Sequence, residues 1–251
     1  MNYKKTLSSI LASLIILTGC SKEKTNSYVE NDAEVKETIE SVEVNTNVEK
    51  ETITEEVFVE PKIEEKEVMY LGYIKDNAMV YDDTLETNIT SEIEKYQKIL
   101  ITKESDYHYF IEDESQLMGY IKKDYVEILP EMFVEVDISS QTVNFYLNNE
   151  LYMNTACVTG NGGVVTRLGY FEITYKAYDT YLKGPGYKSH VYFWMPFDQG
   201  IGLHDADGWR SEYGGDIYLT NGSHGCINMP FEAAETIYNN VDAGTKVLVH
   251  K

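Results

Sequence analysis

Phe133-Val-Glu-Val-Asp-Ile138 and Thr142-Val-Asn-Phe-Tyr-Leu147 both alternate in the period of a strand. Because neighbouring side chains of a strand point to opposite faces, this alternation predicts two strands that each bury one face. Asn148-Asn149 then supplies a turn that tolerates positive φ. Leu151–Val158 returns as a third strand, so this region is predicted to start as β-sheet.

The sequence after these strands predicts more β structure and one late helix. Tyr170-Phe-Glu-Ile-Thr-Tyr175 and Lys246-Val-Leu-Val-His250 have the composition of strands. Phe231–Val241 has the pattern of an amphipathic helix, which we expect Asn228 to cap, with Pro230 in the first turn. The C-terminal region is therefore expected to be mainly β.

Short β-like runs also fill residues 67–129, separated by Asp, Asn and Gly turns. The runs are Val68–Ile74, Ala78–Tyr81, Gln97–Thr102, Tyr107–Ile111 and Gly119–Val126. We expect them to form a small β-barrel. The closing segment Gly119-Tyr-Ile-Lys-Lys-Asp-Tyr-Val-Glu-Ile-Leu129 resembles the end of a bacterial SH3-like domain.

The N-terminus has the features of an export signal over residues 1–20. A basic start precedes the apolar run Leu7–Leu17, which spans about 16 Å as a helix and is too short to cross a hydrocarbon core of about 30 Å. Leu17-Thr-Gly-Cys20 resembles the lipobox of bacterial lipoproteins, which implies lipid on Cys20. Residues 21–66 are acidic and poor in aromatic residues, which predicts a disordered tether.

Charge and cysteine content exclude several kinds of site. A formal net charge of −21 argues against nucleic acid as a partner, because phosphate binding needs a basic surface. The three cysteines, Cys20, Cys157 and Cys226, lack the spacing of a cysteine metal site. Outside the cytoplasm Cys157 and Cys226 could form a disulfide. We favour instead a free reactive thiol at Cys226 and a buried, packed Cys157.

The chemically informative residues lie in Ile201-Gly-Leu-His204-Asp-Ala206 and Ser223-His-Gly-Cys-Ile-Asn228. A cysteine nucleophile reacts as the thiolate, so it needs a lowered pKa and a nearby base. A helix that starts near Asn228 would place its positive end by Cys226 and favour the thiolate. Gly225 would let backbone N–H groups turn towards an oxyanion. The spacing alone leaves open whether His204 or His224 is the base, and a purely structural histidine remains the default.

These two segments resemble the signature of the L,D-transpeptidase, or YkuD, catalytic domain, and the resemblance covers residues 131–251. It implies a β-sandwich with one late helix. It also implies a site without a metal or cofactor. Its residues would be the nucleophile Cys226, the base His204 oriented by the main-chain carbonyl of Asp205, supporting Ser223 and His224, and oxyanion N–H groups of Gly225 and Cys226.

The sequence departs from many relatives at two places. Thr166-Arg-Leu-Gly169 stands where they have Thr-Pro-x-Gly, and Asn228 stands where they have arginine. A substrate contact made by that arginine is therefore in doubt here. Arg210 could bind a substrate carboxylate or be a solvated surface residue, and the aromatic residues Trp194 and Trp209 could form substrate walls or core.

The resemblance implies attack of Cys226 on the third residue of a peptidoglycan tetrapeptide stem, release of D-alanine, and transfer from the thioester to an amine as a 3→3 cross-link. Hydrolysis of the thioester would give L,D-carboxypeptidase activity. The partners would be stem peptides and, through Cys20, the outer face of the membrane, in the service of cell-wall biogenesis and cell shape. The sequence does not decide whether residues 67–129 bind the wall or act as a spacer domain. It does not indicate the oligomeric state either.

Three rival functions are disfavoured. Cysteine endopeptidases of the wall usually place the cysteine before the histidine, whereas His204 precedes Cys226. Sortases need an arginine after the cysteine, and none follows Cys226. A binding lipoprotein with a dead site would not be expected to keep His204, Gly225 and Cys226 together. The resemblance implies that a carbapenem adduct would separate an active enzyme from such a protein.

Overall fold

A computed structural model describes residues 64–161 and 165–251 of the chain. Its first part is a seven-stranded sheet with the order β3-β2-β6-β5-β4-β1-β7. The elements are β1 (Lys66–Ile74), β2 (Ala78–Tyr81), β3 (Ile89–Ile93), β4 (Lys98–Glu104), β5 (His108–Glu112), β6 (Met118–Lys122), the 3-10 helix η1 (Lys123–Tyr125) and β7 (Val126–Ile128). Four of the expected runs correspond to β1, β2, β4 and β5, whereas η1 divides the run Gly119–Val126 between β6 and β7, and β3 is an additional strand.

This sheet is not a closed barrel within the described residues. Each strand pairs antiparallel with its neighbours, but β3 and β7 are the two edges and do not pair with each other. The buried side chains Ile74, Ile99, Ile111 and Ile121 still form one apolar core on the sheet. The mainly β prediction is confirmed here. The small closed barrel expected for 67–129 is not found in the described residues, and the SH3-like assignment stays a prediction.

The second part contains two sheets, with orders β10-β9-β8-β16-β11 and β12-β13-β14-β15. Their strands are β8 (Phe133–Asp137), β9 (Thr142–Leu147), β10 (Glu150–Ala156), β11 (Gly169–Glu172), β12 (Ala177–Gly184), β13 (Tyr187–Asp198), β14 (Ile201–Asp205), β15 (Ile227–Met229) and β16 (Lys246–His250). Two helices are present, α1 (Ile217–Asn221) and α2 (Phe231–Asn240).

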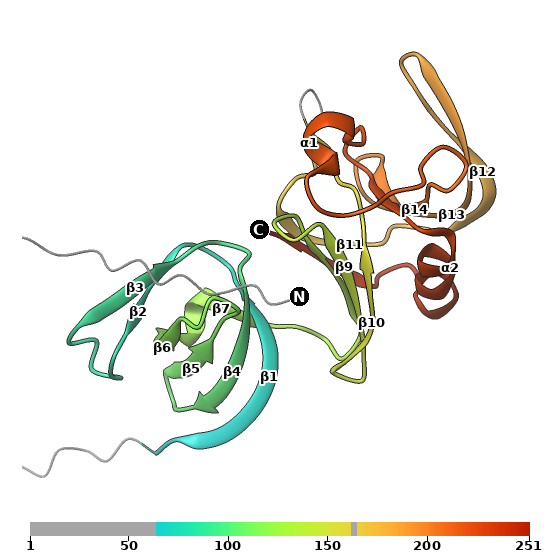
Figure 1. Cartoon of the computed structure of the whole chain (residues 1–251). Coiled ribbons are helices and arrows are strands. Elements are labelled where there is room, and N and C mark those ends of the chain that lie inside the picture. Colours follow the sequence, from blue (N-terminus) through green and yellow to red (C-terminus); the bar gives the residue numbers. More distant parts are fainter. Residues whose placement is uncertain (1–63, 162–164) are drawn as a thin grey trace, which may run out of the picture. The chain divides into compact units, whose positions relative to one another are not determined.

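One apolar core joins both sheets and α2. Val136 and Phe145 come from the first sheet, Met195 and Leu203 from the second, and Ile237 from the helix, and all five are fully buried. Figure 1 shows α2 beside β13 and β14, which it contacts. The expected sandwich-like arrangement with a late helix is therefore present, together with the short α1.

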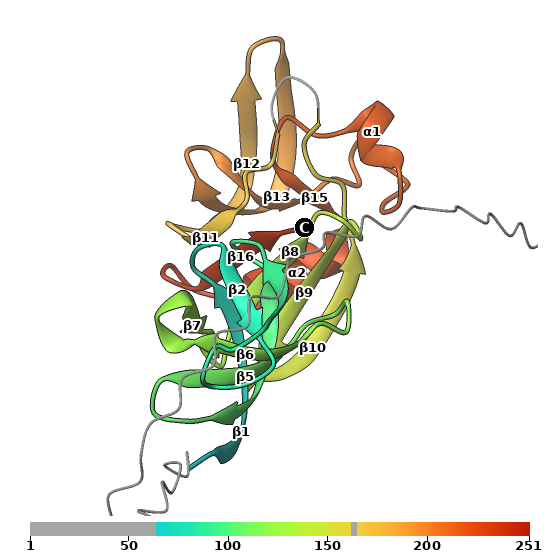
Figure 2. The same ribbon diagram turned by 90° about the vertical axis from the view of Figure 1, so that its left-hand side faces the viewer.

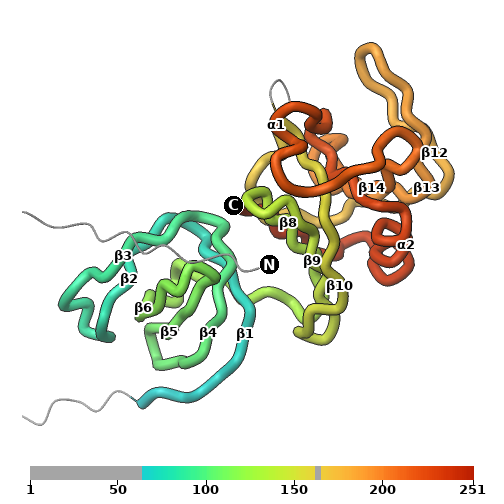
Figure 3. The backbone as a smooth tube through the Cα atoms, viewed as in Figure 1, coloured from blue at the N-terminus to red at the C-terminus, as the bar shows by residue number. Residues whose placement is uncertain are grey.

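The β12–β13 hairpin is the longest ladder of the second sheet. Its pairs run from Ala177↔Trp194 to Gly184↔Tyr187, and Figure 2 shows the hairpin extending beyond the rest of the domain. In Figure 3 the chain can be followed from β14 through α1, and this connection returns to β15, which pairs parallel with β14. A parallel pair needs such a crossover connection.

The predicted turn and helix start have different outcomes. Asn148 and Asn149 take φ of 55° and 63°, so the turn with positive φ is confirmed. The prediction that Asn228 caps the helix is wrong, because Asn228 lies within β15 and exchanges two backbone hydrogen bonds with Val158. Pro230 is the N-cap residue of α2 rather than part of its first turn.

A buried ionic network lies on β8. Glu135 is fully buried and accepts hydrogen bonds from His250 Nε2 at 2.7 Å, Lys98 Nζ at 2.8 Å and Asn144 Nδ2 at 3.0 Å. Burial alone would raise the pKa of Glu135, but the His250 hydrogen bond and the Lys98 charge outweigh it and lower the pKa to about 2. The carboxylate is therefore charged and fully partnered.

Some predictions cannot be compared with the structure. The export signal 1–20, Cys20 and nearly all of the tether 21–66 lie outside the described residues. In the described part of the chain, no helix has the length and apolar character needed to cross a membrane.

We predict that Glu135→Gln lowers the free energy of unfolding by about 1.5–3 kcal/mol, because Lys98 and His250 lose their buried carboxylate partner and Lys98 keeps only the exposed Glu114, 2.7 Å away. Urea unfolding at pH 7 measures this. Glu172→Gln, which removes one partner of the exposed Glu172–Lys246 ion pair, is the control and should cost under about 1 kcal/mol. Equal losses in the two variants would contradict the prediction.

The same prediction has a pH signature. The folded pKa of Glu135 lies below the ordinary value of 4.5, so its stabilisation is present above pH 4.5 and is lost as the pH falls towards about 2. The difference in stability between wild type and Glu135→Gln should therefore shrink across that interval.

Candidate active site

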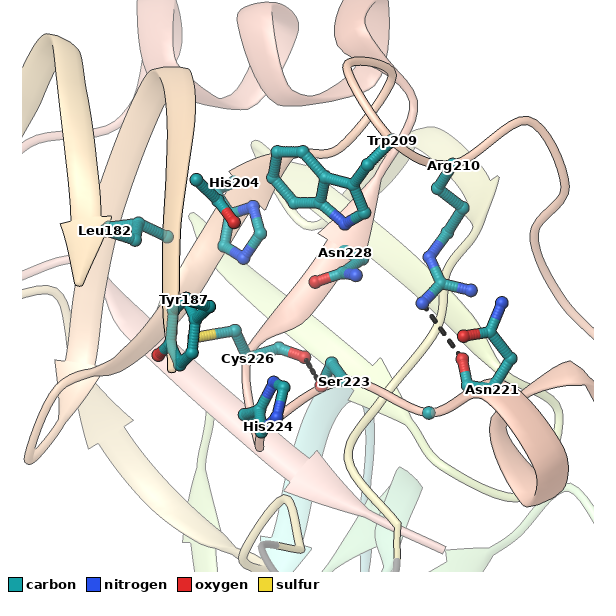
Figure 4. Close-up of a pocket in the computed structure, with 12 residues that line it drawn as sticks. Leu182, Tyr187, His204, Trp209, Arg210, Asn221, Ser223, His224, Cys226 and Asn228 are labelled. Atoms are coloured by element: carbon teal, nitrogen blue, oxygen red, sulfur yellow. Dashed lines mark hydrogen bonds between the residues drawn. The ribbon is translucent and has the colours of Figure 1, made fainter. Parts of the chain in front are cut away.

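Cys226 and His204 line one pocket although they lie on different segments (Figure 4). The parallel pairing of β14 with β15 places Leu203 opposite Ile227 and His204 opposite Asn228. Cys226 directly precedes β15, so this register places it beside the start of β14, level with Gly202. The pocket is lined by Leu182, Tyr187, Ser189, His204, Trp209, Arg210, Asn221, Gly222, Ser223, His224, Cys226 and Asn228.

His204 is held as a neutral base. Its ring is almost fully buried, and Nδ1 lies 2.8 Å from the carbonyl oxygen of Asp205. A carbonyl can only accept, so Nδ1 carries the hydrogen and Nε2 keeps its lone pair. Burial lowers the pKa of His204, which favours this neutral form. The expected contact, in which the main-chain carbonyl of Asp205 orients the imidazole of His204, is therefore present.

Asp205 also fixes the strand that carries it. Its carboxylate Oδ1 accepts backbone N–H groups of Tyr192 at 2.9 Å and Phe193 at 2.8 Å, both on β13. Gly202 allows close approach of the two strands, because a Cβ there would lie 2.6 Å from the carbonyl oxygen of Met195. The backbone around His204 is therefore held to β13 on both sides of the histidine.

Cys226 does not lie at a helix start, so that prediction is wrong. β15 separates Cys226 from α2. Burial raises the pKa of Cys226 to about 11, and a hydrogen bond with the Gly202 backbone only partly opposes the rise. The hydrogen bond from Sγ goes to the Gly200 carbonyl oxygen at 3.8 Å, a weak contact. The resting pair is therefore a thiol and a neutral imidazole, not an ion pair.

The loop before β15 is braced by its own side chains. Ser223 Oγ donates to the carbonyl oxygen of Cys226 and accepts the N–H of Gly225 at 3.1 Å. Gly225 takes φ of 99°, a conformation that favours glycine. Thr166 Oγ1 donates to the Gly225 carbonyl at 2.8 Å. The Gly225 N–H expected for an oxyanion thus has a partner in this conformation.

His224 and Tyr187 form one wall of the pocket. Their rings stack with centroids 4.9 Å apart and an interplanar angle of 16°. His224 is exposed, whereas His204 is buried, so the two histidines that spacing could not separate have different environments. Tyr187 was missed by sequence reasoning. The Gly184-Pro-Gly186 turn before it could have predicted a hairpin, but not what the hairpin would contact.

A second pocket meets the first at Cys226. The two share Leu182, Tyr187 and Cys226. The second is also lined by Tyr175, Ala177, Thr180, Tyr181, Lys183, Trp194 and Gly200. The thiol is therefore accessible from two sides of the β12–β13 hairpin.

The remaining candidate residues divide between pocket and core. Trp194 and Trp209 flank His204, with ring centroids 5.8 Å and 5.9 Å away. Cys157 is fully buried in the apolar core, and both it and Cys226 are free thiols. In the described ranges, no group of three or more His, Cys, Asp or Glu side chains is placed to hold a metal ion.

Arg167, at the departure from the expected Thr-Pro-x-Gly segment, has a structural partner. Its guanidinium pairs with the buried carboxylate of Asp198 at the end of β13. Gln199 and Gly200 follow directly, with positive φ. Arg167 thus anchors the turn whose Gly200 carbonyl contacts the thiol.

Comparisons with known proteins identify the domain that carries this site. Residues 131–249 match the family model of the L,D-transpeptidase catalytic domain, YkuD. The chain is also 40% identical to the catalytic domain of an E. faecium L,D-transpeptidase, over 47% of this chain and 96% of that one, with a TM-score of 0.45. Residues 131–249 are an L,D-transpeptidase catalytic domain of the YkuD family.

Other solved structures of L,D-transpeptidases are similar to this chain. A mutant of the Enterococcus faecium enzyme is 38% identical, with 49% of this chain and 50% of that chain covered and a TM-score of 0.47. An L,D-transpeptidase from Stackebrandtia nassauensis is 27% identical, with 49% and 56% covered and a TM-score of 0.42. The chain thus spans half the length of the first of these proteins. The comparison with curated proteins finds no match.

We predict that alkylation of Cys226 in this domain accelerates about tenfold per pH unit between pH 7 and pH 10, because only the thiolate reacts and the pKa of the thiol is about 11. Iodoacetamide labelling of the full chain, read from the peptide that contains Cys226, measures this rate. The control is the urea-unfolded chain, whose rate should level off around the ordinary pKa of 9.0. A plateau near neutral pH in the folded protein would show a thiolate–imidazolium pair instead.

Proposed function

We propose that this protein forms 3→3 cross-links between peptidoglycan stem peptides through a thioester on Cys226. The observation that carries the proposal is the buried, neutral His204 in one pocket with Cys226, its Nδ1 already bound to the Asp205 carbonyl. Such a pair can remove a proton from sulfur and return it to an amine, as acyl transfer requires.

In the first half-reaction, Sγ of Cys226 attacks the carbonyl carbon of the third stem residue while Nε2 of His204 takes the thiol proton. The C–N bond to the terminal D-alanine then breaks, and His204 returns the proton to the leaving amine. The products are a thioester and free D-alanine. A neutral thiol and a neutral imidazole suit this route, because the proton moves only as the bond to carbon forms.

In the second half-reaction, an amine of another stem attacks the thioester. His204 takes the amine proton, and the departing sulfur regains it as a thiol. The two pockets that share Cys226 support a reaction with two large substrates, because donor and acceptor can approach the sulfur from different sides. Water in place of the amine gives L,D-carboxypeptidase activity.

The oxyanion of each tetrahedral intermediate would be stabilised by backbone N–H groups of Gly225 and Cys226. The Gly225 N–H is bound to Ser223 Oγ at rest. Ser223 Oγ would therefore have to share or release that N–H as negative charge develops. His224, stacked on Tyr187, would support the donor side of the pocket.

We also propose that the protein is exported and held at the outer face of the cell membrane by lipid on Cys20. Leu17-Thr-Gly-Cys20 directly after the apolar run supports this, and the acidic segment 21–66 would let the enzyme reach into the wall. The seven-stranded sheet formed by residues 66–128 would either bind the cell-wall polymer or act as a spacer for the catalytic domain.

We predict that Cys226→Ala abolishes cross-linking of purified tetrapeptide stems and that His204→Ala slows it at least about 100-fold, because the nucleophile and the base are lost. Mass spectrometry of the dimer products measures both. His190→Asn, which changes a histidine of β13 that lines neither pocket, is the control and should retain activity. Full residual activity in Cys226→Ala would refute the mechanism.

We predict that the wild-type chain gains the mass of one carbapenem molecule and that Cys226→Ala gains none, because the strained ring presents a carbonyl to the same sulfur. Intact-mass measurement after incubation at neutral pH tests this. A folded wild-type protein that forms no adduct would point to a dead site.

A further inference from the structure

Arg210 holds a buried positive charge that the protein only partly satisfies. Its side chain is 9% exposed, and Nη2 donates to the carbonyl oxygen of Asn221 at 2.9 Å. Nε and Nη1 are buried and have no hydrogen-bond partner in the described part of the chain. Buried guanidinium donors are rarely left unpaired, because desolvation without a partner is costly. The two free donors therefore point to a ligand.

The unpaired donors belong to the pocket of Cys226 and His204. Among the twelve residues that line it, all within the described ranges, Arg210 alone carries a permanent charge, and none is Asp or Glu. Figure 4 shows the guanidinium across the pocket from Cys226, beyond Asn228. The chain carries a net charge of −21, so this is a local positive site on an acidic protein. Such a pocket favours an anion.

Arg210 is on the histidine side of the thiol. Trp209, its neighbour in the chain, packs its ring 5.9 Å from that of His204. The Arg210 charge, with burial as the larger cause, helps to lower the pKa of His204. A group bound by Arg210 would thus lie in the same pocket as the group that receives the proton from His204.

We propose that Arg210 binds the carboxylate of the terminal residue that leaves the donor stem. This rests on the proposed function, in which His204 protonates the leaving amine. In an α-amino acid the carboxylate is attached to the same carbon as the amine, so a leaving residue with its nitrogen at His204 carries its carboxylate into the adjacent space. Charge-assisted hydrogen bonds from Nε and Nη1 would hold it there.

The proposal assigns Arg210 a role in specificity. A stem that ends in a free carboxylate would be favoured over the same stem ending in a carboxamide, because the amide lacks the charge and its NH₂ group meets a donor. Hydrogen bonds to charged groups make a difference of roughly tenfold to hundredfold. The Asn221 contact, by contrast, braces the end of α1 and would not distinguish the two stems.

The test compares release of D-alanine from a tetrapeptide stem with release of D-alaninamide from the amidated stem, using the full chain. Wild type should favour the acid at least about tenfold in kcat/KM, and Arg210→Gln should bring the ratio near one. Arg210→Lys, which keeps the charge, should retain part of the preference. Lys246→Gln removes a positive charge outside the pocket and should leave the ratio unchanged.

A second measurement does not depend on turnover. D-Alanine should protect Cys226 from iodoacetamide at lower concentrations than D-alaninamide does in wild type, and Arg210→Gln should lose this difference. The labelling rate without ligand should match wild type if the variant is folded. An unchanged acid preference, or unchanged protection in Arg210→Gln, would overturn the proposal. Wild type that releases neither product, yet is protected by D-alanine, would overturn the proposed reaction but keep the carboxylate site.

Discussion

Asp205, the residue that directly follows His204, is the constraint on which the site depends. The carbonyl of Asp205 holds Nδ1 of the imidazole, and the carboxylate of the same residue holds two N–H groups of β13. Orientation of the base and pairing of the strands therefore share one residue. A change at Asp205 that loosens β13 would also free the ring, and the base would lose its defined tautomer.

The parallel pairing of β14 with β15 adds the second half of the site. It places Cys226 beside the start of β14, in the same pocket as His204 but with the hydrogen bond from its sulfur going to the Gly200 carbonyl. The loop before β15 is held by Ser223 and Thr166, whose hydroxyl groups bind backbone atoms on either side of the turn. The site is thus organised mainly by backbone and hydroxyl contacts, with the thiol left protonated until substrate arrives.

Sequence reasoning reached the strands, the late helix and the reactive motif because each has a local signal. Alternation marks Thr142–Leu147, and the glycine before the cysteine marks a turn. It failed where the answer depends on distant partners. Asparagine is a residue type that often caps helices, yet two backbone hydrogen bonds with Val158 hold Asn228 in a strand. The raised pKa of Cys226 follows from burial, which no local pattern encodes.

The same limit applies to Arg210 and Tyr187. The sequence does not distinguish a solvated arginine from one that lines a pocket, and only the fold shows that Nε and Nη1 of Arg210 are buried. Tyr187 lies at the start of β13, and its stacking on His224 requires the base of the hairpin to lie beside the loop that carries Cys226. The turn residues of that hairpin could be recognised in the sequence, but the direction in which the hairpin projects could not be predicted from them (Figure 2).

The burial of Cys157 bears on whether this chain can form an internal disulfide. Its thiol is enclosed in the apolar core, which raises its pKa far above the ordinary range. Thiol–disulfide exchange starts from an accessible thiolate, and this sulfur is neither accessible nor ionised. A disulfide between Cys157 and Cys226 could form only after the apolar core opens around Cys157. The barrier to that opening therefore slows loss of the Cys226 thiol to a disulfide within the chain.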